Sequence, residues 1–179
     1  MTPPYTPGSG EQGYPRTAPA SATPARRVLA AVSLLASAAV AVAPFLPWVW
    51  VSQKAFLLIP AQSRSWTAMD ELPETSSAPG YLALAAGVIG LALALAALAT
   101  GRKPLGLAAL APGVLGAAAC LLFVREVQSY QDQVQSDLIA QLAQAVLDIR
   151  GGLAAGWFLA LGGSVVLLAC GAGHLLRKV

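Results

Sequence analysis

Charged residues are scarce in this chain of 179 residues. Asp, Glu, Lys and Arg together make up 11% of it, whereas hydrophobic residues make up 56% and the mean hydropathy is +0.65. A soluble domain carries about 25% charged residues. This shortage of charge excludes an ordinary soluble globular domain and indicates a protein that lies in a membrane.

Residue types that carry chemistry are also few. The chain has one histidine, His174, so no Ser-His-Asp constellation is present, and it has no phosphate-binding loop of the form G-x-x-x-x-G-K. Two cysteines and one histidine do not make up the ligand set of a structural zinc site. The sequence therefore predicts no catalytic residue, no cofactor-binding residue, no metal ligand and no enzymatic activity.

Long apolar stretches dominate the rest of the chain. Residues 28–51, 80–101, 105–124 and 151–176 lack Asp, Glu, Lys and Arg over the roughly 20 residues that a helix needs to cross a bilayer. Backbone groups in hydrocarbon must find partners within their own segment, so each stretch is expected to be an α-helix. The sequence predicts an all-α fold, an integral membrane four-helix bundle over residues 26–179, with outer loops at 52–79 and 125–150.

The first stretch has an alternative interpretation as a cleaved signal peptide, since Ala41-Val42-Ala43 resembles a small-x-small cleavage site. Its apolar run exceeds the usual length of about 7 to 15 residues, which favours a membrane span. Pro44 and Pro47 are expected to kink or terminate the outer end of that span.

The two cysteines, Cys120 and Cys170, belong to the third and fourth stretches. Because consecutive spans run in opposite directions, one cysteine is expected near each surface of the membrane, about 15 Å or more apart. A disulfide requires Cα atoms within about 7 Å of each other. Both are therefore predicted to be free thiols that pack as small hydrophobic side chains.

Basic residues divide unequally between the two sides of the membrane that the four spans define. One side carries most of the Lys and Arg residues and a single acid, Glu11, whereas the other carries Lys54, Arg64, Arg125, Arg150 and all the remaining acids. Lys and Arg accumulate in cytoplasmic segments, so both termini are expected to be cytoplasmic in a plasma-membrane protein. The aromatic residues near the outer helix ends fit an interfacial belt; they are Trp48, Trp50, Tyr81, Phe123, Trp157 and Phe158.

Residues 1–25 are rich in proline, glycine, serine and threonine. Such a segment does not bury enough apolar surface to offset the entropy lost on ordering, so it is predicted to be a disordered cytoplasmic tail. One interpretation is a docking or phosphorylation segment, with Thr2, Thr6, Thr17 and Thr23 as the candidate positions. The other interpretation is an inert, solubilising leader.

The first outer loop has an apolar run over residues 55–59, followed by the acidic residues Asp70, Glu71 and Glu74. The run is expected to rest on the outer leaflet or to pack against the second loop. Carboxylates bind hard cations, but this spacing lacks the alternating ligands and the central glycine of a calcium loop. No metal site is predicted there.

Apolar residues in the second outer loop recur every three or four positions from Val127 to Ile149. This spacing predicts an amphipathic extracytoplasmic helix. Neither Pro nor Gly occurs between Gly116 and Arg150, so the third span is expected to continue outward as one long helix until Gly151 and Gly152. The helix is interpreted either as packed on the first loop or the membrane surface, or as a surface that binds a partner or a second copy.

Small residues four positions apart occur in the second, third and fourth stretches, where they allow helix backbones to approach closely. They are expected to pack the bundle internally rather than to bind a partner. The pairs are Ala83 and Gly87, Gly113 and Ala117, Gly152 and Gly156, and Ala169 and Gly173.

The order of these features, together with the Leu46-Pro47-Trp48 segment at the end of the first span, resembles that of a known group of proteins. The group comprises small four-span membrane proteins of actinobacteria, including the uncharacterised family encoded near tryptophan biosynthesis genes. The resemblance implies a membrane location and a four-span architecture, and it transfers no functional residue. The layout is also similar to that of claudin-like proteins, although the two loop cysteines expected there are missing.

Two functions fit the sequence. The first is an accessory or scaffolding protein that acts through protein-protein contacts, because the spans are free of charge and the outer helix is amphipathic. The alternative is a small homo-oligomeric channel or a subunit of a transporter. The expected partners are the lipid bilayer and either another protein or a second copy. No nucleic-acid partner is expected, because the net charge of +3 comes from the cytoplasmic flanks.

Overall fold

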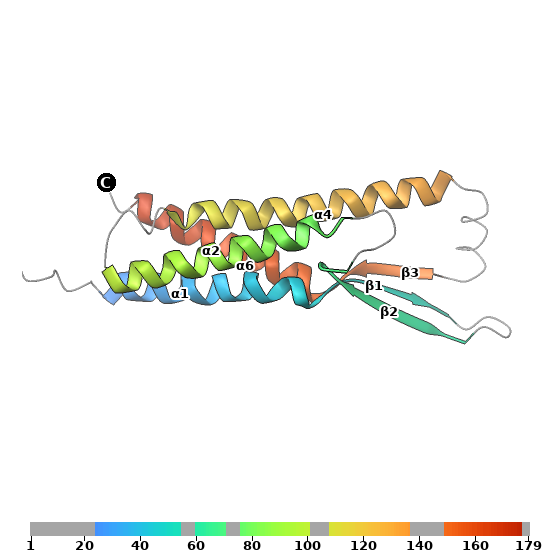
Figure 1. Cartoon of the computed structure of the whole chain (residues 1–179), viewed down its shortest axis with the longest axis horizontal. Coiled ribbons are helices and arrows are strands. Elements are labelled where there is room, and N and C mark those ends of the chain that lie inside the picture. The colour runs from blue at the N-terminus through green and yellow to red at the C-terminus, as the bar shows by residue number, and fades with distance from the viewer. Residues whose placement is uncertain (1–23, 55–59, 71–75, 101–107, 137–148, 177–179) are drawn as a thin grey trace, which may run out of the picture.

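The computed structural model describes residues 24–54, 60–70, 76–100, 108–136 and 149–176. Four long helices form the body of the molecule, and a three-stranded sheet projects beyond one end of it (Figure 1). The helices are α1 (Pro24–Val42), α2 (Ala78–Thr100), α4 (Leu110–Ser136) and α6 (Ala155–Leu176). Each is long and apolar enough to cross a membrane. The 23 residues of α2, for example, measure about 35 Å at the helical rise of about 1.5 Å per residue.

The four helices pack in a ring in which α1 lies between α2 and α6, and α4 closes the ring opposite α1. Consecutive helices run in opposite directions, so that α1 and α4 point toward the sheet (Figure 1). The buried polar side chains among the described residues are Ser33, Ser37 and Ser164. The hydroxyls of Ser37 and Ser164 donate to Ser33 O (2.8 Å) and Ala160 O (2.7 Å) in their own helices, so neither needs a partner across the bundle.

Close helix contacts confirm part of the small-residue prediction. In α2, Ala83 and Gly87 are both buried, and Gly87 lies directly on the backbone of Ala41 in α1. Gly113 likewise packs against Leu168 across the α4 and α6 contact. The pair at the end of α6 behaves differently, because Ala169 is exposed and a Cβ atom at Gly173 would meet nothing within 4 Å.

The sheet is the main departure from the predicted all-α class. Its strands are β1 (Pro47–Gln53), β2 (Gln62–Thr67) and β3 (Ile149–Leu153), in the order β2-β1-β3 with antiparallel neighbours. The first span was therefore predicted too long, since α1 ends at Val42 and a short 3-10 helix, η1 (Ala43–Phe45), leads into β1. Proline lacks the N–H that a helix needs, and the Trp and Val residues that follow Pro47 favour strands.

The fourth span was also predicted to begin too early. Gly151 and Gly152 belong to β3, and α6 begins at Ala155. The pair of Gly152 and Gly156 is consequently not a helical stripe, and its predicted role in helix packing is wrong. Gly152 instead lies under the indole of Trp50 on the neighbouring strand, where an added Cβ would be 3.3 Å from Nε1.

The third helix confirms its predicted outward extension as far as Ser136. It begins at Leu110 rather than at residue 105, and it passes through Arg125 and Glu126 without interruption. The rest of the predicted amphipathic helix, residues 137–148, lies outside the described residues, as do the apolar run 55–59 and most of the predicted tail. Of that tail, Pro24 and Ala25 are described, and they form the start of α1.

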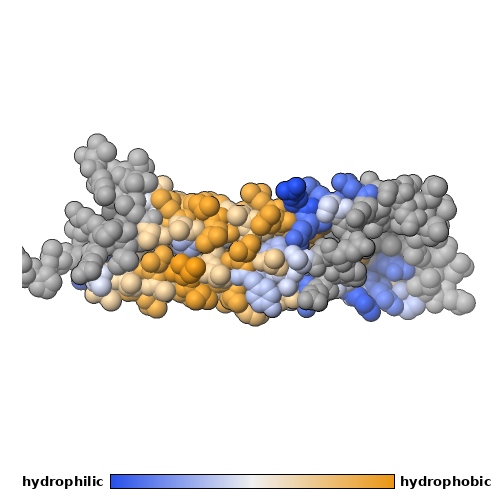
Figure 2. Space-filling model, turned by 45° about the horizontal axis from the view of Figure 1, so that its top comes forward, coloured by the Kyte–Doolittle hydropathy of each residue, from blue (hydrophilic) through white to orange (hydrophobic). Residues whose placement is uncertain are grey.

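Hydrophobic side chains cover the middle of the molecule, and hydrophilic ones gather toward the sheet (Figure 2). Three exposed aromatic side chains, Phe45, Tyr81 and Phe158, lie at or next to the helix ends nearest the sheet. This arrangement supports the predicted aromatic belt for Tyr81 and Phe158. The same prediction was wrong for Trp48 and Phe123, which are buried in the protein core instead.

Candidate interaction surface

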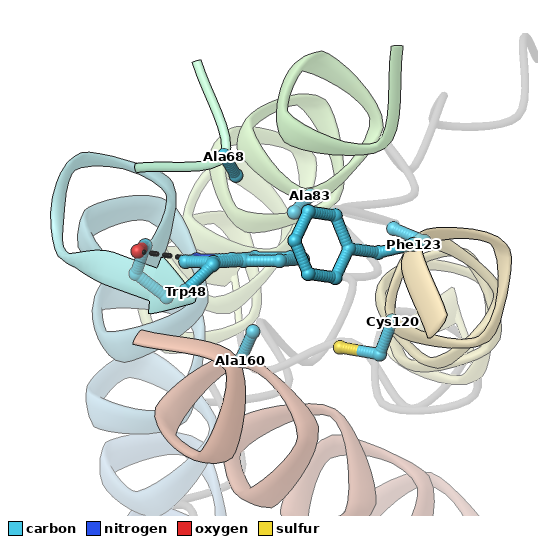
Figure 3. Close-up of a cluster of buried hydrophobic side chains, with 8 residues drawn as sticks. Trp48, Ala68, Ala83, Cys120, Phe123 and Ala160 are labelled. Carbon is cyan, nitrogen blue, oxygen red and sulfur yellow. Dashed lines mark hydrogen bonds between the residues drawn. The ribbon is translucent and has the colours of Figure 1, made fainter. Parts of the chain in front are cut away.

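Trp48 joins the sheet to the helical bundle. Its side chain is fully buried and points between α2 and α6 toward Phe123 of α4 (Figure 3). Its Nε1 donates a hydrogen bond to Ala43 O at 2.7 Å, and its ring meets that of Phe123 edge to face. The other buried members of this cluster are mostly alanines, which leave room for the two rings: Ala43, Ala68, Ala83, Ala119, Cys120 and Ala160.

A second tryptophan ties α6 to α4 at the same level. Trp157 Nε1 donates to the carbonyl oxygen of Cys120 at 3.1 Å. The backbone N–H of Ala154, at the end of β3, donates to Trp48 O at 2.8 Å. Because the buried indole N–H of Trp48 and the partly buried indole N–H of Trp157 both have partners, neither is left unsatisfied at the junction between bundle and sheet.

Two glycines allow the elements to meet closely at this junction. A Cβ atom at Gly156 would lie 2.6 Å from Trp48 Cδ1 and 2.8 Å from Pro47 O. A Cβ atom at Gly80, at the start of α2, would collide with the carbonyl oxygen of Ala68. Contacts this short do not occur in real structures, so the base of the sheet sits against α2 and α6 only because these positions lack side chains.

Of the three acidic residues Asp70, Glu71 and Glu74, the structure describes Asp70. The carboxylate of Asp70 accepts the backbone N–H of Thr67 at 2.7 Å, and Asp70 N donates back to Thr67 O at 3.3 Å. Asp70 therefore caps the end of β2. Glu71 and Glu74 lie outside the described residues, and within the described ranges no group of three metal-ligating side chains occurs.

Glu126 connects the outward part of α4 to the approach to α2. Its Oε1 accepts a hydrogen bond from Ser76 Oγ at 2.9 Å, while Oε2 is buried with no partner among the described residues. The helices α2 and α4 also meet in the buried cluster around Trp48, through Ala83 and Phe123. The outward part of α4 is thus held to the first loop region as well as to the bundle.

The sheet presents two faces with different chemistry. On one face, a shallow pocket is lined by Val51 and Gln53 of β1 and by Gln62, Arg64 and Trp66 of β2. These five residues share a face because Val51 pairs with Arg64 and Gln53 with Gln62 in the antiparallel register. The other face carries the partly exposed indole of Trp50.

Charge on the sheet is of one sign. The strands and the residue that follows β1 include the cations Lys54, Arg64 and Arg150 and contain no Asp or Glu. The strands themselves are therefore basic, and the exposed Arg64 at the centre of β2 favours an acidic group beside it.

Cys120 and Cys170 are both buried, and neither forms a disulfide, as predicted. Cys120 lies in the cluster around Trp48, and its sulfur is surrounded by apolar side chains (Figure 3). The structure thus assigns Cys120 a packing role.

No family model matches this sequence, and no curated protein is similar enough to it to serve as a relative.

Proposed function

We propose that this protein is an integral membrane accessory or scaffolding protein whose projecting sheet and outward helix end bind other proteins. The observation that carries the proposal is the junction at Trp48. A chain that needed only a membrane anchor would not require a sheet joined to the bundle by a fully buried indole and a 2.7 Å hydrogen bond. A rigid platform of this kind is what a binding surface needs, because contacts on rigid elements lose less entropy when a partner docks.

The chemistry of the helices supports binding rather than catalysis or ion transport. Among the described spans, α2 and α6 contain no Asp, Glu, Lys or Arg, and Arg125 and Glu126 of α4 follow its apolar part. The hydroxyls of Ser37 and Ser164 are used within their own helices. Charged side chains inside a membrane usually mark ion and proton pathways, so their scarcity favours a role outside the hydrocarbon.

We propose further that the sheet lies outside the cytoplasm and that both termini are cytoplasmic, in the plasma membrane. The basic flanks at Arg27 and at Arg102 and Lys103 support this orientation. The resemblance to small four-span actinobacterial membrane proteins is consistent with the same layout. On this proposal, residues 1–25 face the cytoplasm and the basic sheet faces the outside.

Crosslinking in native membranes tests the function. The full chain and a variant lacking residues 1–25 are crosslinked, purified in mild detergent and examined by mass spectrometry. We expect a stoichiometric protein partner whose crosslinks map to the sheet or to α4 beyond Arg125, and which the truncated variant retains. Crosslinks between copies of the chain alone would contradict the proposal and favour the homo-oligomeric channel, which ion flux into reconstituted vesicles would then test against empty vesicles.

A further inference from the structure

We infer that the outer edge of β2 is a docking site for an extended, acidic segment of a partner protein, which pairs with β2 as an antiparallel fourth strand. The inference rests on the proposed binding function and names the surface and the chemistry of the partner. In the described part of the chain, the sheet order is β2-β1-β3, so β2 has β1 on one side only.

The backbone groups of β2 point alternately toward β1 and toward the outer edge of the sheet. Both the N–H and the C=O of Thr67 are bonded to Asp70, so this residue points to the outer edge. Backbone groups alternate between the two sides of an antiparallel strand. Ser63 and Ser65, two and four residues earlier, therefore direct their N–H and C=O groups to the same outer edge.

The pairing of β1 with its two neighbours independently identifies the same outward-facing residues of β2. Trp48 O accepts from Ala154 N on the β3 side, so alternation turns Val49, Val51 and Gln53 toward β2. Their partners in the register are Trp66, Arg64 and Gln62. These three residues of β2 therefore bond to β1, which leaves Ser63 and Ser65 for a further strand.

The edge has a defined length. Asp70 occupies the backbone groups of Thr67 and closes the edge next to the bundle. The available ladder is consequently the outward part of β2, around Ser63 and Ser65. Both side chains are small and exposed, so they leave space for the side chains of an added strand.

Side-chain chemistry selects an acidic partner. Arg64 is exposed at the centre of β2 and lies on the pocket face between Gln62 and Trp66. A residue of the added strand that shares this face stands beside Arg64, where opposite charges attract and like charges repel. Since β2 contains no acid, a Lys or Arg at that position of the added strand would be repelled by Arg64.

Strand direction argues against a second copy in the same membrane. β1 runs away from the bundle, whereas β2 and β3 both return toward it. Copies in one membrane share this orientation, so both of their edge strands would meet β2 in parallel. Parallel pairs are slightly less stable and occur mostly in buried sheets. An antiparallel strand must run outward, and a segment of another protein can supply it.

A peptide probe tests the edge directly. The full chain in lipid nanodiscs is titrated with a fluorescent peptide of alternating Glu and Val, and with a matched peptide of alternating Lys and Val, by fluorescence anisotropy. We expect saturable binding of the Glu peptide and none of the Lys peptide. Arg64→Gln should weaken binding of the Glu peptide, and Arg64→Glu should transfer binding to the Lys peptide.

Backbone pairing is tested separately from charge. Ser65→Pro removes an edge N–H without removing a bond to β1, and proline is tolerated on edge strands. We expect this substitution to weaken binding of the Glu peptide about tenfold, because it removes a hydrogen bond and bends the edge. Ser65→Ala keeps the N–H and is the matched control, with unchanged affinity expected. Ser63→Pro repeats the test at the other edge position, and tryptophan fluorescence checks that each variant keeps its sheet.

Several results would overturn the inference. These are no saturable binding of the Glu peptide, equal binding of the Lys peptide, or full affinity in folded Ser65→Pro. Loss of self-association in Ser65→Pro without an effect on the peptide would assign the edge to a second copy instead. A native partner that still crosslinks to Ser65→Pro would leave the accessory function intact while removing β2 as its site. Peptide binding without any native partner would contradict the accessory function alone.

Discussion

The ring of Trp48 meets the ring of Phe123 edge to face, with centroids 5.0 Å apart and an angle of 81° between their planes. The two residues belong to different layers, because Trp48 is in β1 and Phe123 is in α4. Aromatic pairs in this geometry contribute about 0.5–1.5 kcal/mol beyond the area they bury. The contact therefore couples the position of the sheet to the bundle.

Replacement of Trp48 should destabilise both the sheet and the helical bundle, because its side chain packs between them. We expect Trp48→Ala to lower the free energy of unfolding by about 3–5 kcal/mol, because it opens a large cavity among alanines that have no side chain to fill it. Trp48→Phe keeps most of the apolar volume but loses the hydrogen bond to Ala43 O, so its effect should be smaller. Thermal unfolding in detergent measures both variants.

Trp50→Ala is the control for that series, since the Trp50 indole is 40% exposed. We expect a loss well below that of Trp48→Ala. Equal losses for the two substitutions would show that burial of Trp48 does not hold the junction together.

Two adjacent glycines of α6 should respond oppositely to alanine. A Cβ atom at Gly163 would lie 2.7 Å from Val40 Cγ2 and 3.0 Å from Ala36 O, so Gly163→Ala should push α1 and α6 apart at a cost of about 1–3 kcal/mol. A Cβ atom at Gly162 would meet nothing within 4 Å. Gly162→Ala should be neutral or stabilising by up to about 1 kcal/mol through helix propensity. The free energies of unfolding of the two variants are compared by titration with a denaturing detergent. A reversed order of stability would contradict the packing of α1 against α6.

Gly116 and Ser164 should show energetic coupling. A Cβ atom at Gly116 would collide with Ser164 Oγ but would lie 3.4 Å from Ser164 Cβ, an ordinary contact. Gly116→Ala alone should therefore be destabilising, and adding Ser164→Ala should restore most of the lost stability. The hydroxyl of Ser164 bonds only within its own helix, so Ser164→Ala by itself should have little effect. A double-mutant cycle measures the coupling, and simple additivity would rule it out.

Asp70 should control the stability of the end of β2. Asp70→Ala removes the acceptor of the Thr67 N–H, so that amide should exchange with solvent deuterium about tenfold faster. Asp70→Asn keeps a side-chain oxygen and should preserve most of the protection. The Arg64 amide faces β1 and provides an internal control in the same spectra. Unchanged exchange at Thr67 in Asp70→Ala would exclude the cap.

The proposed orientation predicts a labelling pattern. Both native cysteines are buried, so they should react slowly with a membrane-impermeant maleimide in intact cells. Ser63→Cys on the exposed strand should label from outside, whereas Arg102→Cys should label only after permeabilisation. The opposite pattern would invert the proposed topology while leaving the fold unchanged.

The sequence anticipated the helices well because crossing a membrane is a local requirement. A run of about 20 apolar residues is sufficient for a span whatever the rest of the chain does. The outward continuation of α4 followed from an uninterrupted helical pattern past Arg125. Spacing in the sequence also separated Cys120 from Cys170, and the structure has no disulfide between them.

The sheet was missed because its strands depend on partners that lie far apart in the chain. The segment from Trp48 to Val51 has the composition of a strand, yet as an apolar run it also extends the preceding helix. It pairs with Leu153 through Val49 and with Trp66 on its other side, and neither pairing leaves a local signal. The same long-range pairing made Trp48 a core residue instead of an interfacial one.

The sequence by itself determined that this protein has four apolar helices and an unequal distribution of basic residues between the segments that connect them. Tertiary structure alone decided where α1 stops, which tryptophan is buried, and that Ser63 and Ser65 form an edge. The physical reason is the range of the interactions. Transfer of apolar residues into lipid is a sum over neighbouring residues, whereas strand register and the packing of Trp48 against Phe123 exist only once distant segments meet.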